Sequence, residues 1–405
     1  MTHPDMSEQT TPVSLLGTLP RSPFERLREL LGSTPAGKAP IDLSIGAPRH
    51  AFPPIVQEVL ASDIDGFSHY PPAHARNDFG TATGQWLVNR FALDNLDPST
   101  HILPLAGSRE GLFTIAFIVA QISRDHGKTT PTIAFPNPFY QVYASAAIAA
   151  GTQPIALPAI AANGNLPDLS ALDEGLLKSL AAFYICSPAN PQGAVADLDY
   201  LTQLTELARH YKFIVLADEC YSEIYRKVAP PSILNAAQSD SYRSVLAFNS
   251  LSKRSNVPGL RVGLVAGDPK LIARFFSFRN VAAATVPGPL MATAAALWRD
   301  ETHVTANRAA YNEKFTRAAA ILGNRFQHQT PPGGFFLWLN VAEHGGSVTA
   351  AKRLWSEAGV KVVPGSYLAA SHPCGFNPGG NYLRIALVGG LDEIDAALNR
   401  MISIF

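Results

Sequence analysis

Short apolar runs that end in polar or glycine residues recur through the middle of the chain, and stretches of helical period separate most of them. One helical period covers 109–123. Five apolar runs lie at 132–137, 181–187, 213–219, 244–250 and 262–267. Runs of this length without alternation are typical of strands buried on both faces, as in parallel sheets. The pattern therefore predicts an α/β fold with a mainly parallel sheet flanked by helices.

The pattern changes after Pro287. Residues 289–326 predict one very long helix or two, and shorter elements follow up to a last helix at the C-terminus. Strands are expected at 333–341, 360–365 and 382–388, with a helix at 348–358. This alternation indicates a second, smaller α+β domain.

The first ordered element is expected over 22–30. Ser22 and Glu25 have the spacing of a capping box, and Pro23 stands at the first helical position. We therefore expect four parts: a flexible segment over 1–20, an N-terminal arm over 21–48 that joins the small domain, a large domain over 49–287 and a small domain over 288–405.

Composition and charge exclude several classes of protein. The chain has 405 residues, 47% hydrophobic and 16% charged, which is enough for two domains that share a core. Its net charge is zero and no basic run stands out, so a nucleic-acid partner is not expected. Residues 1–20 lack the pattern of a signal peptide, and the apolar run 112–122 is too short to span a bilayer. We expect no membrane segment.

The three cysteines, Cys186, Cys220 and Cys374, lie far apart, and no C-x-x-C pair exists. A disulfide framework or a metal site is therefore not expected, and the cysteine usage suits the reducing cytoplasm. Cys220, at the end of an apolar run, is expected to be a small core residue.

Polar and aromatic residues follow the predicted strands. In an open α/β sheet, ligands bind beyond the carboxyl ends of the strands. The residues at these ends are Gly107, Ser108 and Arg109 after 102–106, Tyr140 after 132–137, Asn190 after 181–187, Asp218 and Tyr221 after 213–217, and Ser250, Ser252 and Lys253 after 244–250. Each alone has an ordinary explanation, such as a cap, a turn or a core residue. Five such ends together predict a binding site.

One of these ends also fits another motif. Ser250 and Lys253 match S-x-x-K, the nucleophile signature of penicillin-binding proteins and β-lactamases. That family also needs S-D-N and K-T-G elements downstream, and the sequence after Ser250 contains neither. The lysine is therefore the expected nucleophile, and the serines are expected to be phosphate ligands.

The strand-end residues suit a pyridine aldehyde that carries a phosphate. The phosphate would bind at the helix N-terminus that Gly107, Ser108 and Arg109 begin, with Ser250, Ser252 and Arg261 as further donors. The ring would need the remaining groups: Asp218 at the protonated nitrogen, Asn190 and Tyr221 at the ring oxygen, Tyr140 on the face and Lys253 at the aldehyde.

Six segments resemble motifs of one family and occur in its order: "LAGSREGLF", "PNPFYQVY", "SPANPQG", "ADECY", "SLSKRSNVPGLRVG" and "YLRIAL". From about residue 22 to 400 the chain resembles the fold-type I pyridoxal-phosphate aminotransferases of class I/II. The resemblance implies pyridoxal 5'-phosphate as cofactor, and Lys253 as the residue that binds it and moves the substrate proton. It also implies amino acids and 2-oxo acids as substrates.

The resemblance adds three residues. Arg384 matches the arginine that binds the substrate α-carboxylate, and Gly46 matches the glycine whose backbone approaches the same group. Tyr70 matches the tyrosine that reaches the phosphate of the neighbouring subunit, which implies a homodimer with shared active sites. The segment after Tyr70 departs from the family, because Ala75 stands where glycine is common.

Within the family, the segment around Lys253 most resembles the bacterial N-succinyl-L,L-diaminopimelate aminotransferases of lysine biosynthesis. Other expected activities are aspartate, alanine or aromatic aminotransferase, or a carbon–sulfur lyase that uses the same cofactor. A transcription regulator with an aminotransferase-like domain is not expected, because the residues before Gly46 contain no helix-turn-helix pattern. A succinylated amino-acid substrate also needs cationic or polar residues that bind its distal carboxylates. We expect Arg49 or Arg279 to take this role.

Overall fold

A seven-stranded sheet forms the centre of the computed structural model, which describes residues 19–71, 73–282, 285–372 and 374–405. The strand order is β2-β8-β7-β6-β5-β3-β4. The strands are β2 Ile102–Leu105, β3 Thr132–Asn137, β4 Gln153–Pro158, β5 Leu180–Cys186, β6 Ile214–Asp218, β7 Val245–Ser250 and β8 Gly263–Gly267. All pairings from β7 to β4 are parallel, and β8 runs antiparallel to both neighbours. The mainly parallel sheet predicted from the sequence is confirmed.

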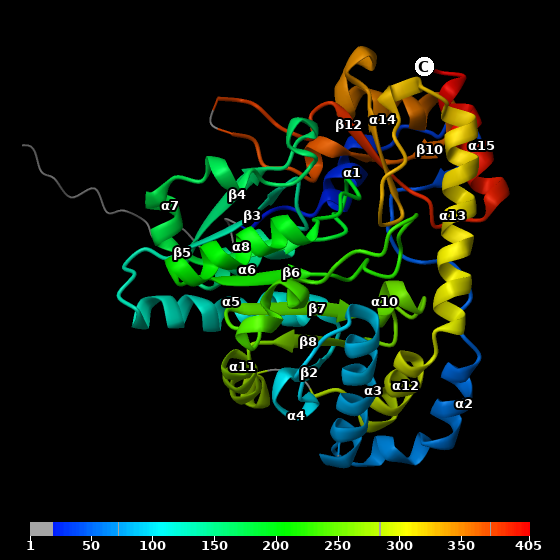
Figure 1. Cartoon of the computed structure of the whole chain (residues 1–405). Helices are drawn as coiled ribbons and strands as arrows, with labels where there is room; N and C mark the ends of the chain where they lie inside the picture. Colours follow the sequence, from blue (N-terminus) through cyan, green and yellow to red (C-terminus); the bar gives the residue numbers. More distant parts are fainter. Residues whose placement is uncertain (1–18, 72, 283–284, 373) are drawn as a thin grey trace, which may run out of the picture.

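Two layers of helices cover the sheet, because successive side chains of each strand point to opposite faces. In β5, Ala182 and Tyr184 pack with one layer, and Phe183 and Ile185 pack with the other. The first layer contains α5 Ser108–Asp125, α6 Val142–Ala149 and α11 Pro269–Ala282. The second contains α3 Ala73–Phe91, α7 Glu174–Ser179, α8 Leu198–Tyr211, α9 Ile233–Ala237 and α12 Gly288–Arg299. Figure 1 shows the sheet between them.

A smaller unit packs against one end of this sandwich. Its core surrounds a three-stranded antiparallel sheet, β11-β12-β9, and a parallel pair, β1-β10. The strands are β1 Ile41–Asp42, β9 Phe336–Asn340, β10 Val360–Lys361, β11 Val363–Pro364 and β12 Tyr382–Ala386. The helices α14 Gly346–Ala358 and α15 Leu391–Ile402 pack on them.

The N-terminal helix α1, Pro23–Leu31, belongs to the small unit by its contacts. Leu27 and Leu31 are buried with Val363 and Leu368. Pro23 opens the helix as the sequence predicts, but the Ser22 side chain makes no capping hydrogen bond. The capping box predicted for this end is therefore wrong.

Residues 289–326 form two helices, α12 and α13, Thr302–Leu322. Met291, Ala295 and Trp298 of α12 are buried in the core of the large unit, so packing joins α12 to that unit. The core of the large unit therefore includes residues beyond the predicted boundary at 287/288. The change in the hydrophobic pattern marks the start of a helical region. The chain passes from the large unit to the small unit along α13.

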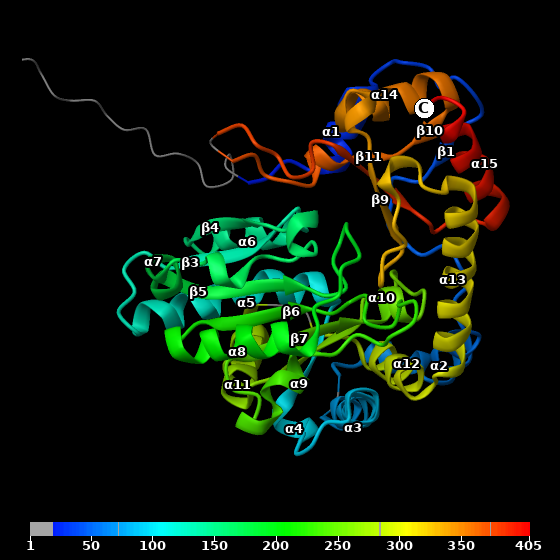
Figure 2. The ribbon, with the colours of Figure 1, turned by 45° about the horizontal axis from the view of Figure 1, so that its top comes forward.

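Helix α13 connects the two units. In its first half, Asn307 Nδ2 donates to the backbone carbonyls of Lys253 at 3.3 Å and Arg254 at 3.4 Å. In its second half, Phe315, Ala318 and Leu322 are buried in the small unit's core. Figures 1 and 2 both show it running from α12 to α15 along one side of the molecule.

The remaining α-helices are short. They are α2 Ile55–Ser62, α4 Pro98–His101 and α10 Leu251–Arg254. Within the described ranges, no helix combines the length and the apolar character needed to cross a membrane.

Candidate active site

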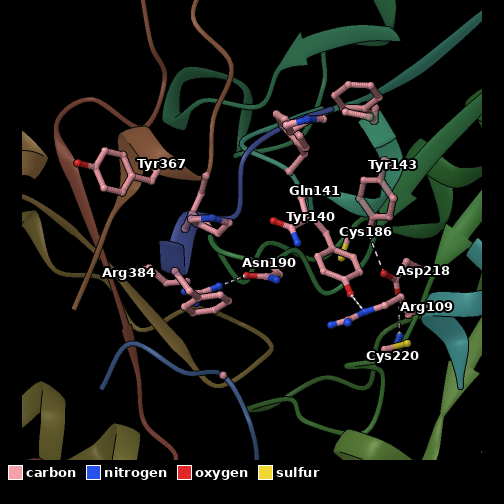
Figure 3. A pocket seen from close by; sticks show the side chains of 18 of the residues that line it. Arg109, Tyr140, Gln141, Tyr143, Cys186, Asn190, Asp218, Cys220, Tyr367 and Arg384 are labelled. Carbon is pink, nitrogen blue, oxygen red and sulfur yellow. Dashed lines mark hydrogen bonds between the residues drawn. The ribbon is translucent and has the colours of Figure 1, made fainter. Parts of the chain in front are cut away.

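A cavity of about 820 Å³ lies at the carboxyl ends of the sheet strands, against the small unit. Figure 3 shows its wall from close by. The predicted residues that line it are Gly46, Ser108, Arg109, Tyr140, Asn190, Asp218, Tyr221, Ser250, Ser252, Lys253, Arg261 and Arg384. Parallel strands bring these distant segments to one edge of the sheet, which is why strand ends located them.

Lys253 extends into this cavity from α10, directly after β7. Its Nζ donates to the carbonyl of Gly46 at 2.6 Å, and it also lies over the rings of Phe335 and Tyr221, at 5.3 and 5.9 Å from their centres. Burial lowers the pKa of Lys253 to about 8, and the nearby arginines Arg384 and Arg109 act in the same direction. A lysine with this pKa is partly neutral near physiological pH, as an amine nucleophile must be.

Ser250 is not held by the lysine. Its Oγ accepts from the backbone N–H of Ser252 at 3.1 Å and lies 3.0 Å from Ser252 Oγ. Since Lys253 Nζ donates to Gly46 instead, the geometry is not that of a lysine-activated serine. Both serine hydroxyls are left on the cavity wall as hydrogen-bonding groups.

Asp218 is a buried carboxylate at the end of β6, 5% exposed. The Tyr143 hydroxyl donates to its Oδ2 at 2.7 Å, and the Cys220 N–H donates to its Oδ1 at 3.3 Å (Figure 3). Burial raises the pKa of Asp218, and these hydrogen bonds oppose the increase. Because both donors are neutral, the carboxylate suits a cationic group inside the cavity, such as a protonated ring nitrogen.

The start of α5, beside the cavity, has the features of an anion cradle. Gly107 is the N-cap of α5, and no side chain caps the first N–H groups of that helix. The Arg261 guanidinium packs so closely on Gly107 that an added Cβ would lie 2.1 Å from Arg261 Nη2. Gly107 also has φ +83°, which favours glycine. Open N–H groups and an arginine at one helix N-terminus suit a phosphate.

Arg384, on β12, is 4% exposed and faces the cavity beside Asn190. Its Nη1 donates to Asn190 Oδ1 at 3.2 Å (Figure 3), and its Nη2 donates to the Ser44 carbonyl at 2.9 Å. Its Nε is buried and has no partner within the described part of the chain. Burial lowers the pKa of Arg384 to about 10. A buried guanidinium with an unused donor suits a carboxylate ligand.

Arg109 and Tyr140 lie together on the wall. Arg109 Nε donates to the Tyr140 hydroxyl at 2.5 Å, and this pair is visible in Figure 3. Desolvation raises the pKa of Tyr140, and Arg109 opposes that increase. The Arg109 side chain is thus engaged with an aromatic residue, although the phosphate role was predicted for it.

Tyr70 does not line the cavity of a single chain. Its side chain is 95% exposed, at the end of a segment just before α3. Pro72, in the turn that departs from the family pattern, lies outside the described residues, and so do residues 1–18 of the predicted flexible segment.

The two arginines predicted to bind a distal carboxylate lie outside the main cavity. Arg49 pairs with Glu393 at 3.0 Å and lines a separate, smaller cavity. Arg279 is 7% exposed and is held by both carboxylate oxygens of Glu110, each at 2.9 Å. Neither arginine lines the main cavity, because sequence proximity to Gly46 or to the domain junction does not determine where a side chain points.

Cys220 is not a plain core residue either. Its thiol donates to Ser108 Oγ at 3.0 Å, and the residue lines the cavity. Sequence reasoning also missed many lining residues, among them Arg26, Gln141, Tyr143 and Tyr367. Tyr143 stands three residues after Tyr140, a spacing that a helical turn brings to one side, so a signal for it existed. Arg26 follows no predicted strand, so the sequence gave no signal for it.

The cavity therefore combines a phosphate cradle, a buried anion for a ring cation, a lysine for an aldehyde and an arginine for a carboxylate. The unpartnered Arg384 Nε and the Gly107–Arg261 contact are features of this structure that such a ligand explains. The residues present thus fit pyridoxal phosphate together with an amino acid.

Two of the sequence relatives are named for the reaction that they catalyse. The chain is 31% identical over 364 residues to the 4-dedimethylamino-4-oxo-anhydrotetracycline transaminase OxyQ of Streptomyces rimosus. The aligned region covers 89% of this chain and 92% of that protein. It is also 31% identical over 371 residues to the LL-diaminopimelate aminotransferase of Aquifex aeolicus, with 89% and 90% covered.

Solved structures agree with these relatives. An aminotransferase from Neisseria meningitidis superposes with a TM-score of 0.91 at 36% identity, covering 97% of this chain and 99% of that one. A probable N-succinyldiaminopimelate aminotransferase from Thermus thermophilus gives 0.82 at 26% identity, covering 95% and 100%. The family model for aminotransferase class I and II matches residues 38–401. The chain belongs to this family of pyridoxal-phosphate-dependent aminotransferases.

Proposed function

We propose that the enzyme transfers the α-amino group of N-succinyl-L,L-diaminopimelate to 2-oxoglutarate, a step in the biosynthesis of diaminopimelate and lysine. The observation that carries this proposal is the size and charge of the cavity. Its volume of about 820 Å³ is near the upper end of small-molecule sites, which span roughly 300–1,000 Å³. Its wall also contains more arginines than one phosphate and one α-carboxylate use.

Similarity supports the same substrate class. The Aquifex aeolicus relative is an LL-diaminopimelate aminotransferase, and the Thermus thermophilus structure is described as a probable N-succinyldiaminopimelate aminotransferase. Both act on a long amino acid with a second acidic end, by their names. A pocket for such a donor needs length beyond the α-carboxylate site, and the cavity provides it.

The side chains divide the work. Bound pyridoxal phosphate supplies an aldehyde for the amino group and an electron-poor ring beside the substrate α-carbon. Asp218 keeps the proton on the ring nitrogen, and Asn190 and Tyr221 donate to the ring oxygen. Arg384 holds the α-carboxylate and so fixes the orientation of the substrate. Lys253 Nζ takes and returns the α-proton, for which a pKa of about 8 is well suited.

The proposal includes a homodimer with shared active sites. Phe52, Phe67 and Tyr70 are 55%, 48% and 95% exposed in a single chain, and they lie close together in the sequence. Large apolar side chains that gather at one exposed segment support a contact surface. In the dimer, Tyr70 reaches the phosphate in the partner subunit. The free cysteines support a location in the cytoplasm.

A donor panel tests the proposed substrate. Purified enzyme is supplied with 2-oxoglutarate and, in turn, N-succinyl-L,L-diaminopimelate, unmodified L,L-diaminopimelate, aspartate, alanine and phenylalanine, and glutamate formation is measured. We expect the highest kcat/KM with the succinylated donor. A higher value with any other donor rejects the proposed substrate, and pyruvate release without added 2-oxo acid would identify a lyase instead.

A further inference from the structure

The wall of the main cavity holds six cationic side chains and one carboxylate. The cations are Arg21, Arg26, Arg109, Lys253, Arg261 and Arg384, and the carboxylate is Asp218. Arg384 is buried, Arg26 and Lys253 are partly buried, and the other three cations lie at the exposed rim. The wall as a whole therefore carries an excess of positive charge, which favours anionic ligands. A phosphate and one α-carboxylate account for only part of this excess.

Five of the six cations have acceptors in the structure. Lys253 donates to the Gly46 carbonyl, and Arg384 donates to Asn190 and Ser44. The remaining three are engaged as follows: Arg261 with the carbonyls of Pro258 and Ala106, Arg109 with the Tyr140 hydroxyl, and Arg21 with the Glu29 carboxylate.

Arg26 differs from them. Its guanidinium stacks on the ring of Tyr367, 3.9 Å from the ring centre. Within the described ranges it has neither a hydrogen-bond acceptor nor an ion-pair partner. Stacking occupies the flat face of a guanidinium and leaves the N–H groups at its edge free, in a fixed plane. Arg26 is therefore held in place by Tyr367, with its N–H groups open to a ligand in the cavity.

The position of Arg26 is fixed by the packing of α1. Leu27 and Leu31 anchor this helix to the small unit, and Phe24 lies 6.0 Å from the Arg384 guanidinium. Arg26 thus comes from the same helix that borders the α-carboxylate site. Tyr367, its stacking partner, lies with Arg384 on the side of the cavity away from Asp218 (Figure 3).

Apolar residues also line the cavity, among them Ile45, Leu368, Ala369 and Ala370. Apolar lining suits a methylene chain, and two arginines on the same wall, Arg26 and Arg384, suit a donor with a carboxylate at each end of such a chain. A plain hydrophobic donor would leave Arg26 buried against it without a partner, which is unfavourable.

We propose that Arg26 binds the carboxylate at the end of the donor's side chain, so that this site selects amino acids with an acidic terminus. This inference rests on the aminotransferase function proposed above and names a specificity residue for it. Arg26 on α1 replaces Arg49 and Arg279 in that role.

The test compares Arg26→Gln with Arg28→Gln. Arg28 lies on the same helix, is exposed and does not line the cavity, so it controls for changes in charge and in helix stability. Each enzyme is assayed with an acidic donor and a counterpart that lacks its terminal carboxylate: glutamate with glutamine, 2-aminoadipate with norleucine, and N-succinyl- with N-butanoyl-L,L-diaminopimelate. The butanoyl compound keeps the carboxylate beside the acylated nitrogen, so the third pair tests the succinyl end alone. The pair whose acidic member the wild type uses best is decisive.

For that pair, Arg26→Gln should lower kcat/KM for the donor with the terminal carboxylate by about ten- to a hundredfold and leave kcat/KM for its counterpart nearly unchanged. Arg28→Gln should change neither. Equal losses for both donors, no loss for either, or a selective loss in Arg21→Gln instead would overturn the proposal. If the wild type rejects the succinylated donor, the proposed substrate fails, whereas the other two pairs still decide the role of Arg26.

Discussion

Burial sets the protonation of the two groups on which the chemistry depends, Lys253 and Asp218. Both are buried at the same edge of the sheet, and burial disfavours the charged form of each, lowering the pKa of the lysine and raising that of the carboxylate. The lower pKa makes the lysine a better nucleophile, and the higher pKa makes the carboxylate easier to protonate. A cationic ring nitrogen beside Asp218 would favour its ionised form.

The lysine predicts the pH dependence of cofactor uptake. The folded pKa of Lys253, about 8, lies below its ordinary value of 10.5, so the neutral amine that attacks an aldehyde increases as the pH rises to 8. The rate at which cofactor-free enzyme gains its visible absorbance from added pyridoxal phosphate should rise about tenfold per pH unit below 8 and level off above it. A rate that keeps rising to pH 10 would mean an unshifted lysine. Lys253→Ala should give no such absorbance.

Tyr143 predicts a shift in the acidic limb of activity. Its hydroxyl stabilises the Asp218 carboxylate, so Tyr143→Phe should raise the pKa of Asp218 further. Because the ionised carboxylate is needed, activity should be lost at a higher pH, and kcat at neutral pH should fall by about tenfold. Full pH profiles of kcat measure this.

Tyr184→Phe is the matched control. Tyr184 stacks on Tyr143 at 4.7 Å, and its hydroxyl donates to the Leu112 carbonyl rather than to Asp218. This variant should lower the thermal midpoint and leave the acidic limb unmoved. If both variants shift the limb equally, Tyr143 acts only through packing.

At the scale of elements, turns that follow the strands line the cavity, and the sequence predicted this part of the site. Residues directly after β2, β3, β5, β6 and β7 line the cavity, so a local pattern located Lys253, Asp218 and Asn190. Arg26 and Tyr367 gave no such signal, because a helix and a loop far apart in the chain meet only through the packing of α1. The side on which Arg49 and Arg279 point likewise depends on their ion-pair partners, Glu393 and Glu110.

The turn before α5 predicts a steric effect on the cofactor. In Gly107→Ala the new methyl group would collide with Arg261, whose own φ of +59° leaves it little freedom to move. Affinity for pyridoxal phosphate should fall by about tenfold or more, as a displaced charge-assisted contact would cause. Titration of the cofactor-free enzyme measures this.

Gly127→Ala separates collision from backbone strain. Gly127 follows the same helix, has the same φ of +83° and has no atom within 4 Å of an added Cβ. Both variants should lose thermal stability, but only Gly107→Ala should lose cofactor affinity. Equal affinity in the two variants would rule out the steric account.

At the scale of the whole molecule, the fold class and the two-unit arrangement follow from the sequence, but the assembly does not. A single chain exposes Tyr70 almost completely, although it matches a residue that reaches a phosphate. The pattern of apolar and polar positions describes what is buried within one chain. It carries no direct record of which exposed residues meet a second copy.

Mixing two inactive variants tests the shared site. In a hybrid of Lys253→Ala and Tyr70→Ala subunits, one site combines both defects, and the other combines an intact Lys253 with an intact Tyr70 from the partner. Random hybrids of a two-fold dimer should therefore regain about a quarter of wild-type activity. If Tyr70 serves its own subunit, mixing should restore nothing. Size-exclusion chromatography checks that hybrids form.

Helix α13 has a mechanical consequence. It is 21 residues and thus about 30 Å long, and its far end is fixed in the small unit that carries Arg384. Any rotation of that unit must bend α13 or turn the helix about its first turns. Asn307, in these first turns, donates a hydrogen bond to the backbone carbonyl of Lys253. Movement of Arg384 towards an arriving carboxylate is therefore transmitted along α13 to the backbone of Lys253.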